Sequence, residues 1–142
     1  MDNDSFFWQI QAGRLPVPPA ARTLGMRILA VDTAAASIDV EFQAQQAFLN
    51  PAGQIQGGFL AAMLDDCMGP ALAAGLAAGE FAPTLQLNVQ FLRPAHIGRI
   101  QGRGQVVRRG RDVCHLAGEL RQDDQLIATA TATALIRQAP RG

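Results

Sequence analysis

The sequence predicts an α+β domain in which an antiparallel sheet curls around one long, buried helix. A glycine-rich loop at residues 50–58 runs into a helix-length segment that is apolar on nearly every side. The stretch from Thr84 to Phe91 then alternates polar and apolar side chains, which is the period of a strand that buries one face. Three more strand-like segments follow, and two precede the helix, so the predicted order is β-β-α-β-β-β-β.

Length and composition favour a single domain over residues 1–142, with an N-terminal helix and a proline-rich connector in residues 1–20. The hydrophobic fraction is 49% and the mean hydropathy is +0.09. Both values are typical of a globular protein, and no segment has the low hydrophobicity of a disordered region.

The charged residues exclude some classes of partner. All twelve basic residues are arginine, and they balance twelve acidic residues to a formal charge of zero. Nine of these arginines fall in the last fifty positions, but only Phe91 accompanies them as an aromatic residue in the C-terminal strands. A nucleic-acid site needs a more basic surface with interleaved aromatic residues, so we expect none.

The remaining composition indicates a cytoplasmic protein without metal or cofactor. Cys67 and Cys114 have neither metal-ligand spacing nor the pattern of a disulfide framework, so we expect two buried, reduced thiols. The acidic N-terminus lacks the basic region of a signal peptide. The longest apolar run, residues 57–79, carries Asp65, Asp66 and Pro70 near its centre, which argues against a membrane span.

Before the central helix, the sequence predicts a short helix over residues 6–11 that acts as a lid or brace, with Phe6 and Ile10 on one face. Asp4 or Ser5 can cap it. Residues 16–19, Pro-Val-Pro-Pro, are expected to form an extended connector. Two strands, residues 24–31 and 37–42, then form a hairpin with a turn near residues 32–33.

After the central helix, which Pro70 is expected to bend or end, three further strands follow the one that Pro94 ends. They span residues 99–108, 112–121 and 125–136, with turns at residues 109–111 and 123–124. The last strand alternates alanine and threonine from Ala128 to Ala134. Its alanine face leaves room for a helix to lie close against the sheet.

The loop and helix carry the pattern Asn50-x2-Gly53-x2-Gln56-Gly57-Gly58-x6-Asp65. With Thr84 and the strands on both sides, this pattern resembles hotdog-fold acyl-CoA thioesterases of the phenylacetyl-CoA (PaaI-like) type. The resemblance covers residues 24–137 and implies a hydrolase that cleaves acyl-CoA to free acid and CoA. One position departs from the pattern, because the family has histidine where this chain has Gln56. An amide keeps a hydrogen bond but cannot titrate near neutral pH.

Four residues are the candidates for the chemistry. The backbone N–H of Gly57, in the first turn of the helix, has no intrahelical acceptor and can stabilise an oxyanion. Asp65 can activate water as a general base or attack the thioester directly. Thr84 can orient the water, and Asn50 can hold the thioester or the aspartate. Close packing at the two glycines, and an ordinary strand role for Thr84, are the structural alternatives.

Helix geometry divides these residues between two chains. Gly57 and Asp65 are eight residues apart, which is roughly 12 Å along one helix. A single carbonyl cannot reach both, so we expect a homodimer with shared active sites, each built from Asn50 and Gly57 of one chain and Asp65 and Thr84 of the other. The resembling family usually assembles two such dimers into a homotetramer.

The remaining expectations concern the substrate, a medium-chain or aromatic acyl-CoA. We assign Gln56 and Gly58 to substrate binding, together with a set of arginines that could bind the CoA phosphates or form only a solvated turn: Arg108, Arg109 and Arg111. The acyl pocket is expected to draw on Phe6, Trp8, Phe48, Phe59 and Met63. Asp66 lies about 100° around the helix from Asp65 and is expected to be a hydrogen-bonded interface or capping residue. The alternative function is a non-catalytic acyl-CoA binding protein.

Overall fold

The computed structural model describes residues 5–139 of the chain. In these residues, three short helices and one long helix accompany the strands. The order is α1 (Phe6–Gln11), α2 (Pro19–Thr23), β1 (Arg27–Asp32), β2 (Ser37–Ala44), η1 (Gln46–Phe48), α3 (Gly57–Ala73), β3 (Glu80–Phe81), β4 (Thr84–Phe91), β5 (Gly98–Arg109), β6 (Val113–Gln122), β7 (Gln125–Leu135) and β8 (Arg137–Gln138).

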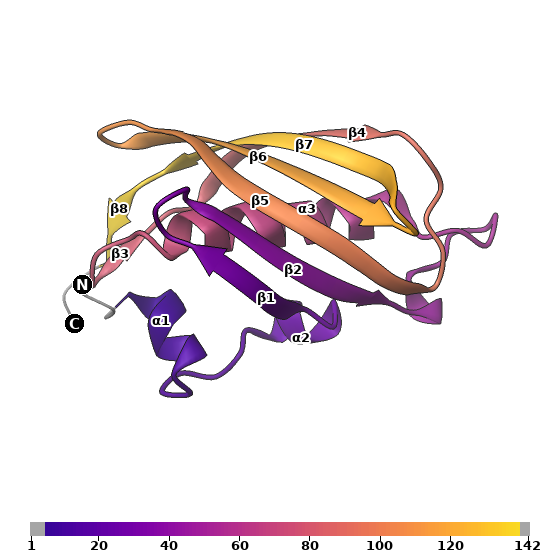
Figure 1. Ribbon diagram of the computed structural model, residues 1–142, viewed down its shortest axis with the longest axis horizontal. Helices are drawn as coiled ribbons and strands as arrows, with labels where there is room; N and C mark the ends of the chain where they lie inside the picture. Colours follow the sequence, from indigo (N-terminus) through magenta and orange to yellow (C-terminus); the bar gives the residue numbers. More distant parts are fainter. Residues whose placement is uncertain (1–4, 140–142) are drawn as a thin grey trace.

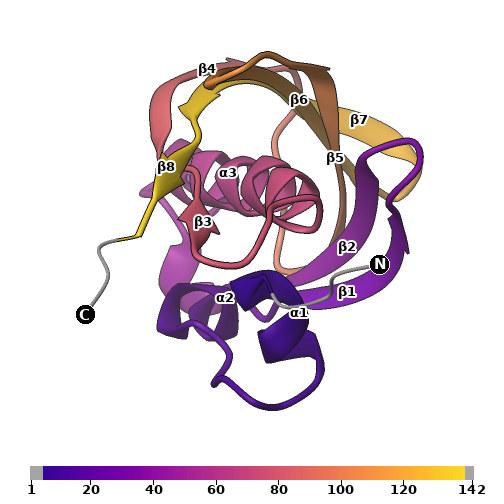
Figure 2. The same cartoon turned by 90° about the vertical axis from the view of Figure 1, so that its left-hand side faces the viewer.

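The six long strands form one antiparallel sheet in the order β1-β2-β5-β6-β7-β4. This sheet curves around α3, as Figures 1 and 2 show from two directions. Helices α1 and α2 lie across the side of α3 that the sheet leaves open (Figure 2). The predicted α+β architecture is therefore confirmed, and the order of its long elements is as expected.

Small residues let α3 lie close against the sheet. A Cβ atom added at Gly104 would collide with the backbone carbonyl of Cys67, and one added at Gly118 would lie 3.0 Å from Cγ of Met68. The predicted alanine face of β7 is also buried against the core: Ala128, Ala130, Ala132 and Ala134 are each at most 6% exposed. The helix is thus held at a separation that larger side chains would not permit.

Pro70 does not end the helix. Helix α3 continues to Ala73, although Pro70 lacks an N–H group and leaves the Asp66 carbonyl without its usual donor. The residues that follow, Ala71, Leu72 and Ala73, are all buried. Their packing stabilises the last turn and outweighs the missing hydrogen bond.

Two features of the fold that were not predicted are the short helix α2 and a small second sheet. The proline run was expected to be extended throughout, but Pro19 begins the short helix α2. Proline is well suited to a first helical position, where its missing N–H has no acceptor in any case. The second feature is the small two-stranded sheet of β3 and β8, whose strands of two residues each are too short to give a periodic pattern.

Helix α1 matches its predicted range, but a different residue anchors it. Phe7 is 4% exposed, whereas Phe6 is 41% exposed. The Phe7 ring lies edge-on to Trp8, whose indole Nε1 donates a hydrogen bond of 2.9 Å to the carbonyl of Ala74, just beyond α3. Helix α1 is therefore fixed to the C-terminal end of α3.

Candidate active site

The structure joins Asp65 and Thr84 directly. Thr84 Oγ1 donates a hydrogen bond of 2.9 Å to Asp65 Oδ1. Asp65 lies in the third turn of α3, and Thr84 is the first residue of β4. The bond occupies one carboxylate oxygen and leaves the other free to accept a proton from water.

A bulge in β4 turns Thr84 toward the helix. Thr84 pairs with Ala134 and Leu87 pairs with Ala132, with a register shift between Thr84 and Gln86. Because Ala134 and Ala132 share the buried face of β7, the shift puts Thr84 on the same face as Leu87. Strict alternation would have placed Thr84 on the opposite face. The same bulge leaves Leu85 59% exposed.

A cavity of about 620 Å³ adjoins this pair, between the C-terminal half of α3 and the N-terminal segment. Its polar lining includes Asp65, Asp66 and Thr84, and most of its remaining wall is apolar. Helix α3 contributes Gly69, Pro70 and Ala73, while the cover contributes Phe6, Phe7, Ile10, Val17, Pro18 and Ala21. A cavity of this size and character suits an acyl group.

Only part of the expected pocket wall lies here. Phe6 lines the cavity, but Trp8, Phe48, Phe59 and Met63 do not. Phe48 and Phe59 stack on each other with ring centroids 4.2 Å apart, and Met63 is fully buried in the core. Apolar character made these residues candidates for the pocket wall, but it could not tell a core position from a cavity wall.

Asp66 lies in the same cavity. Its Oδ2 atom is buried and has no partner within residues 5–139. Burial, and to a smaller extent the neighbouring charge of Asp65, together raise the pKa of Asp66 from 3.8 to about 6.

The start of α3 offers free backbone donors. Within the described residues, the N–H groups of Gly57 and Gly58 have no acceptor. Gln56 precedes them in an extended conformation, is exposed, and makes no side-chain capping bond. A Cβ atom added at Gly57 would lie 3.0 Å from the Phe91 ring, whereas one added at Gly58 would meet open space.

Asn50 shapes the loop that leads to this helix. Its Oδ1 atom accepts hydrogen bonds from the N–H groups of Ala52, at 3.0 Å, and Gln54, at 3.1 Å. Its own N–H donates to the Gln54 carbonyl at 2.7 Å. The side-chain oxygen is thus occupied within the loop, and only the amide nitrogen of Asn50 is available to a substrate.

The predicted site residues therefore fall into two groups within one chain. Asp65 and Thr84 line the cavity, whereas Asn50, Gln56, Gly57 and Gly58 do not. The two groups lie at different points along α3, as the spacing of Gly57 and Asp65 requires.

The three arginines at the turn between β5 and β6, Arg108, Arg109 and Arg111, also differ in their contacts. Arg109 Nη1 donates a hydrogen bond of 2.8 Å to the Gly75 carbonyl, and Nη2 lies 3.8 Å from Glu80 Oε1. Arg109 thus fixes the segment after α3. Arg108 and Arg111 are exposed and have no partner within the described part of the chain.

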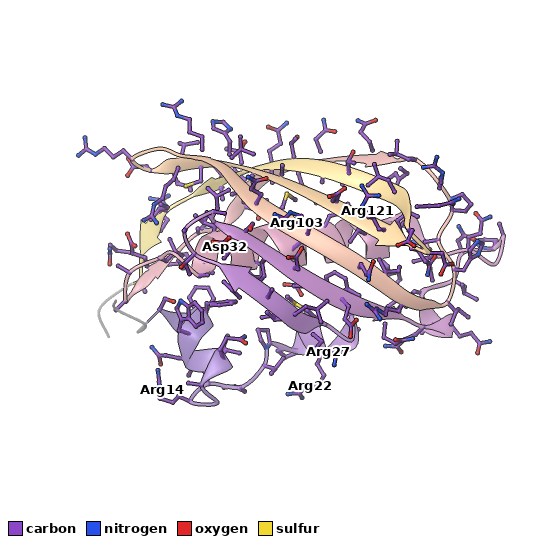
Figure 3. All side chains as sticks on the ribbon, in the orientation of Figure 1. Arg14, Arg22, Arg27, Asp32, Arg103 and Arg121 are labelled. Carbon is purple, nitrogen blue, oxygen red and sulfur yellow. The ribbon has the colours of Figure 1, made fainter. Side chains whose placement is uncertain are left out.

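Most other arginines on the sheet are neutralised by neighbours. Arg103 pairs with Asp39 at 3.0 Å and Arg121 with Glu119 at 3.2 Å. Figure 3 shows Arg103 and Arg121 over the strands on the side turned to the viewer, and Arg27 beside the lower strand. Arg27 pairs with Glu41. These side chains are therefore poorly placed to attract a phosphate.

Comparisons with known proteins agree with this geometry. The family model described as Thioesterase superfamily matches residues 52–129. The chain belongs to the thioesterase superfamily. Among solved structures, a phenylacetic acid degradation-related protein from Ralstonia eutropha JMP134 is 50% identical to this thioesterase, with a TM-score of 0.90 over 92% of this chain and 98% of the other.

Two more distant structures share the hotdog fold of this thioesterase. The PaaI protein from the phenylacetic acid degradation operon of E. coli is 21% identical, with a TM-score of 0.82 over 94% of both chains. Thioesterase HI1161 from Haemophilus influenzae is also 21% identical, with a TM-score of 0.81 over 92% of this chain and 90% of the other. No match was found among curated proteins.

The family assignment establishes the enzyme class as acyl-CoA thioester hydrolase. Within residues 5–139, no three histidine, cysteine, aspartate or glutamate side chains come together as a metal site. None of the helices in the same range is long and apolar enough to cross a membrane.

Proposed function

We propose that this thioesterase hydrolyses a medium-chain or aromatic acyl-CoA, with the acyl group in the cavity beside Asp65. The observation that carries the proposal is the Asp65–Thr84 hydrogen bond at an apolar cavity of about 620 Å³. The cavity exceeds the needs of an acetyl group, and its apolar wall gains by excluding water from an alkyl chain or a ring.

In this proposal, Asp65 acts on the thioester carbonyl either through an activated water or by direct attack. Thr84 holds one carboxylate oxygen, so the other oxygen is presented to the water or to the carbonyl carbon. The tetrahedral intermediate then places negative charge on the former carbonyl oxygen. A backbone N–H at a helix start stabilises such a charge, and Gly57 supplies one.

The second half of each site comes from a partner subunit. Gly57 of the partner subunit supplies the oxyanion donor, while Asp65 and Thr84 of the first supply the attacking side. Strand β4 supports this arrangement, because it is an edge strand of the six-stranded sheet and carries the exposed side chains of Leu85 and Phe91. An unprotected edge strand of eight residues is a site for pairing with a second chain.

We further propose that two such dimers form a homotetramer in the cytoplasm, where the buried thiols of Cys67 and Cys114 stay reduced. Arg108 and Arg111 are the candidates for the CoA phosphates, since both are exposed and unpaired within the described residues. Arg109 is left out of this role because its guanidinium group is already bonded to Gly75.

The direct test is an acyl-CoA panel with CoA release followed by a thiol reagent. Octanoyl-CoA and phenylacetyl-CoA should be turned over faster than acetyl-CoA, and Asp65→Asn should lower kcat by about 10²- to 10⁴-fold. Wild-type turnover by Asp65→Asn on every substrate would remove Asp65 as the catalyst. Ligand-induced stabilisation without turnover would instead identify an acyl-CoA binding protein, the function to which Gln56 lends support.

A further inference from the structure

Asp66 is a carboxyl group that the proposed mechanism does not use, although it lines the same cavity as Asp65. The two residues are neighbours on α3 and diverge by about 100° around its axis. Asp66 Oδ2 is buried and has no hydrogen-bond donor within residues 5–139. A buried carboxylate oxygen without a donor is costly, so this group requires an explanation.

Among residues 5–139, no cation near Asp66 is free to neutralise it. On its own helix, the adjacent ionisable groups are Asp65, which is also acidic, and Cys67, a thiol whose pKa is raised by burial and by the charge of Asp66. From β1, the cavity receives Arg27, whose side chain is 69% exposed and pairs with Glu41. The polar side chains contributed by the other surrounding elements are Gln11 from α1 and Thr84 from β4, and neither titrates in this range. No histidine of the described part of the chain lines the cavity.

The solvation of an ionised Asp66 therefore depends on water inside the cavity. Burial, followed by the charge of Asp65, already raises the pKa of Asp66 to about 6. An apolar acyl group that fills the cavity removes this water and offers no hydrogen bond in exchange. Loss of this water destabilises the ionised form of Asp66 much more than the protonated form.

We propose that Asp66 is a specificity-determining residue whose carboxyl group takes up a proton when an apolar acyl group fills the cavity. Acidic conditions then favour large apolar acyl groups over acetyl, which leaves most of the cavity hydrated. The proposal rests on the proposed function, because it places the acyl group in this cavity. It adds a dependence of substrate choice on pH.

The direction of this pH dependence follows from the linkage between proton binding at Asp66 and binding of the acyl group. Below about pH 6, Asp66 is already neutral and a large acyl group binds without taking up a proton. Above it, each pH unit lowers the affinity for that acyl group by up to roughly tenfold, because a proton must be bound first. Acetyl-CoA should show no such loss.

The experiment compares substrates within one enzyme. The ratio of kcat/KM for octanoyl-CoA to that for acetyl-CoA is measured from about pH 5.5 to about pH 7.5, since the titration of shared catalytic groups cancels in the ratio. The ratio should fall at least about fivefold in the wild type and stay within about twofold for Asp66→Asn. A flat wild-type ratio, or an unchanged slope in Asp66→Asn, would overturn the proposal.

A control and a second readout complete the test. Asp124→Asn removes a charge from an exposed turn at φ +63°, a conformation that asparagine tolerates, and should keep the wild-type slope. Calorimetry with S-octyl-CoA, a thioether that cannot be hydrolysed, in buffers of different ionisation enthalpy should show proton uptake near pH 7 that Asp66→Asn abolishes. Binding without proton uptake overturns the proposal.

This second readout does not require catalysis. Proton uptake in a protein that turns over no acyl-CoA would refute the proposed function and keep the role of Asp66. Turnover of octanoyl-CoA with a pH-independent ratio would do the reverse.

Discussion

Thr84 Oγ1 lies 2.9 Å from Asp65 Oδ1, although the two residues are nineteen positions apart in the chain and belong to different elements. The contact depends on the bulge that follows Thr84, since regular pairing would direct this side chain to the other face of the sheet. The hydrogen bond that holds the proposed catalytic carboxylate therefore depends on an irregularity in the strand beside it.

Removing the hydroxyl group tests this contact. We expect Thr84→Val to lower kcat by roughly tenfold or more, because the carboxylate of Asp65 loses the donor that orients it. Thr84→Ser retains a hydroxyl and should keep most of the activity. The measurement is steady-state kinetics on octanoyl-CoA. Equal activity of Thr84→Val and the wild type would show that the hydrogen bond has no catalytic role.

The proposed oxyanion donor, the N–H group of Gly57, can be deleted without removing a side chain. Gly57→Pro eliminates the N–H at the first position of α3, where proline is well tolerated, and Gln56 already has the extended backbone that precedes proline. We expect kcat to fall by about 10²- to 10³-fold with little change in circular dichroism. Gly57→Ala is the matched control, because it makes the same contact with Phe91 but keeps the N–H.

Mixing inactive variants tests whether sites are shared. In a heterodimer of Asp65→Asn and Gly57→Pro, one site has both substitutions and the other has neither, provided each site joins Asp65 of one chain to Gly57 of the other. Denaturing and refolding the two variants together should recover about one quarter of the wild-type activity, since half of the dimers are mixed and each has one intact site. No recovery would place the complete site in one chain.

The stability of the protein should depend on Asp66. Its pKa is raised from 3.8 to about 6, so the folded state is favoured while the group is neutral and this advantage is lost as pH rises from about 4 through 6. Asp66→Asn should raise the free energy of unfolding by about 1 to 3 kcal/mol more at pH 7.5 than at pH 4. Urea denaturation at the two pH values measures this, and an equal effect at both would contradict it.

The cover of the cavity should set the size of the acyl group. Ile10 lines the cavity from α1 and is only partly buried, so Ile10→Trp fills space without breaking the core. We expect KM for octanoyl-CoA to rise about tenfold while acetyl-CoA is affected less than twofold. Val107→Trp, on an exposed part of β5 away from this cavity, is the control. An equal rise in KM for octanoyl-CoA and acetyl-CoA would show that the acyl group binds outside this cavity.

Much of this site followed from the sequence because its signals are local. The glycines before a helix, the carboxylate eight residues later and the alternating strand each depend on short-range geometry, and the range of β4 was predicted as Thr84–Phe91. The bulge was not predicted, because a strand of uninterrupted alternation gives no sign that one residue pairs irregularly. The role of Arg109 was also hidden, since its partners Gly75 and Glu80 are about thirty residues away.

The attachment of α1 to α3 has a practical consequence. The chain contains one tryptophan, and it is Trp8, whose indole N–H bonds to Ala74 while its neighbours Phe6 and Phe7 line the cavity. Emission from this single indole comes from the cover alone, without background from elsewhere in the protein. The enzyme therefore carries a built-in optical reporter, and a spectral change on adding S-octyl-CoA would follow occupancy of the cavity in real time.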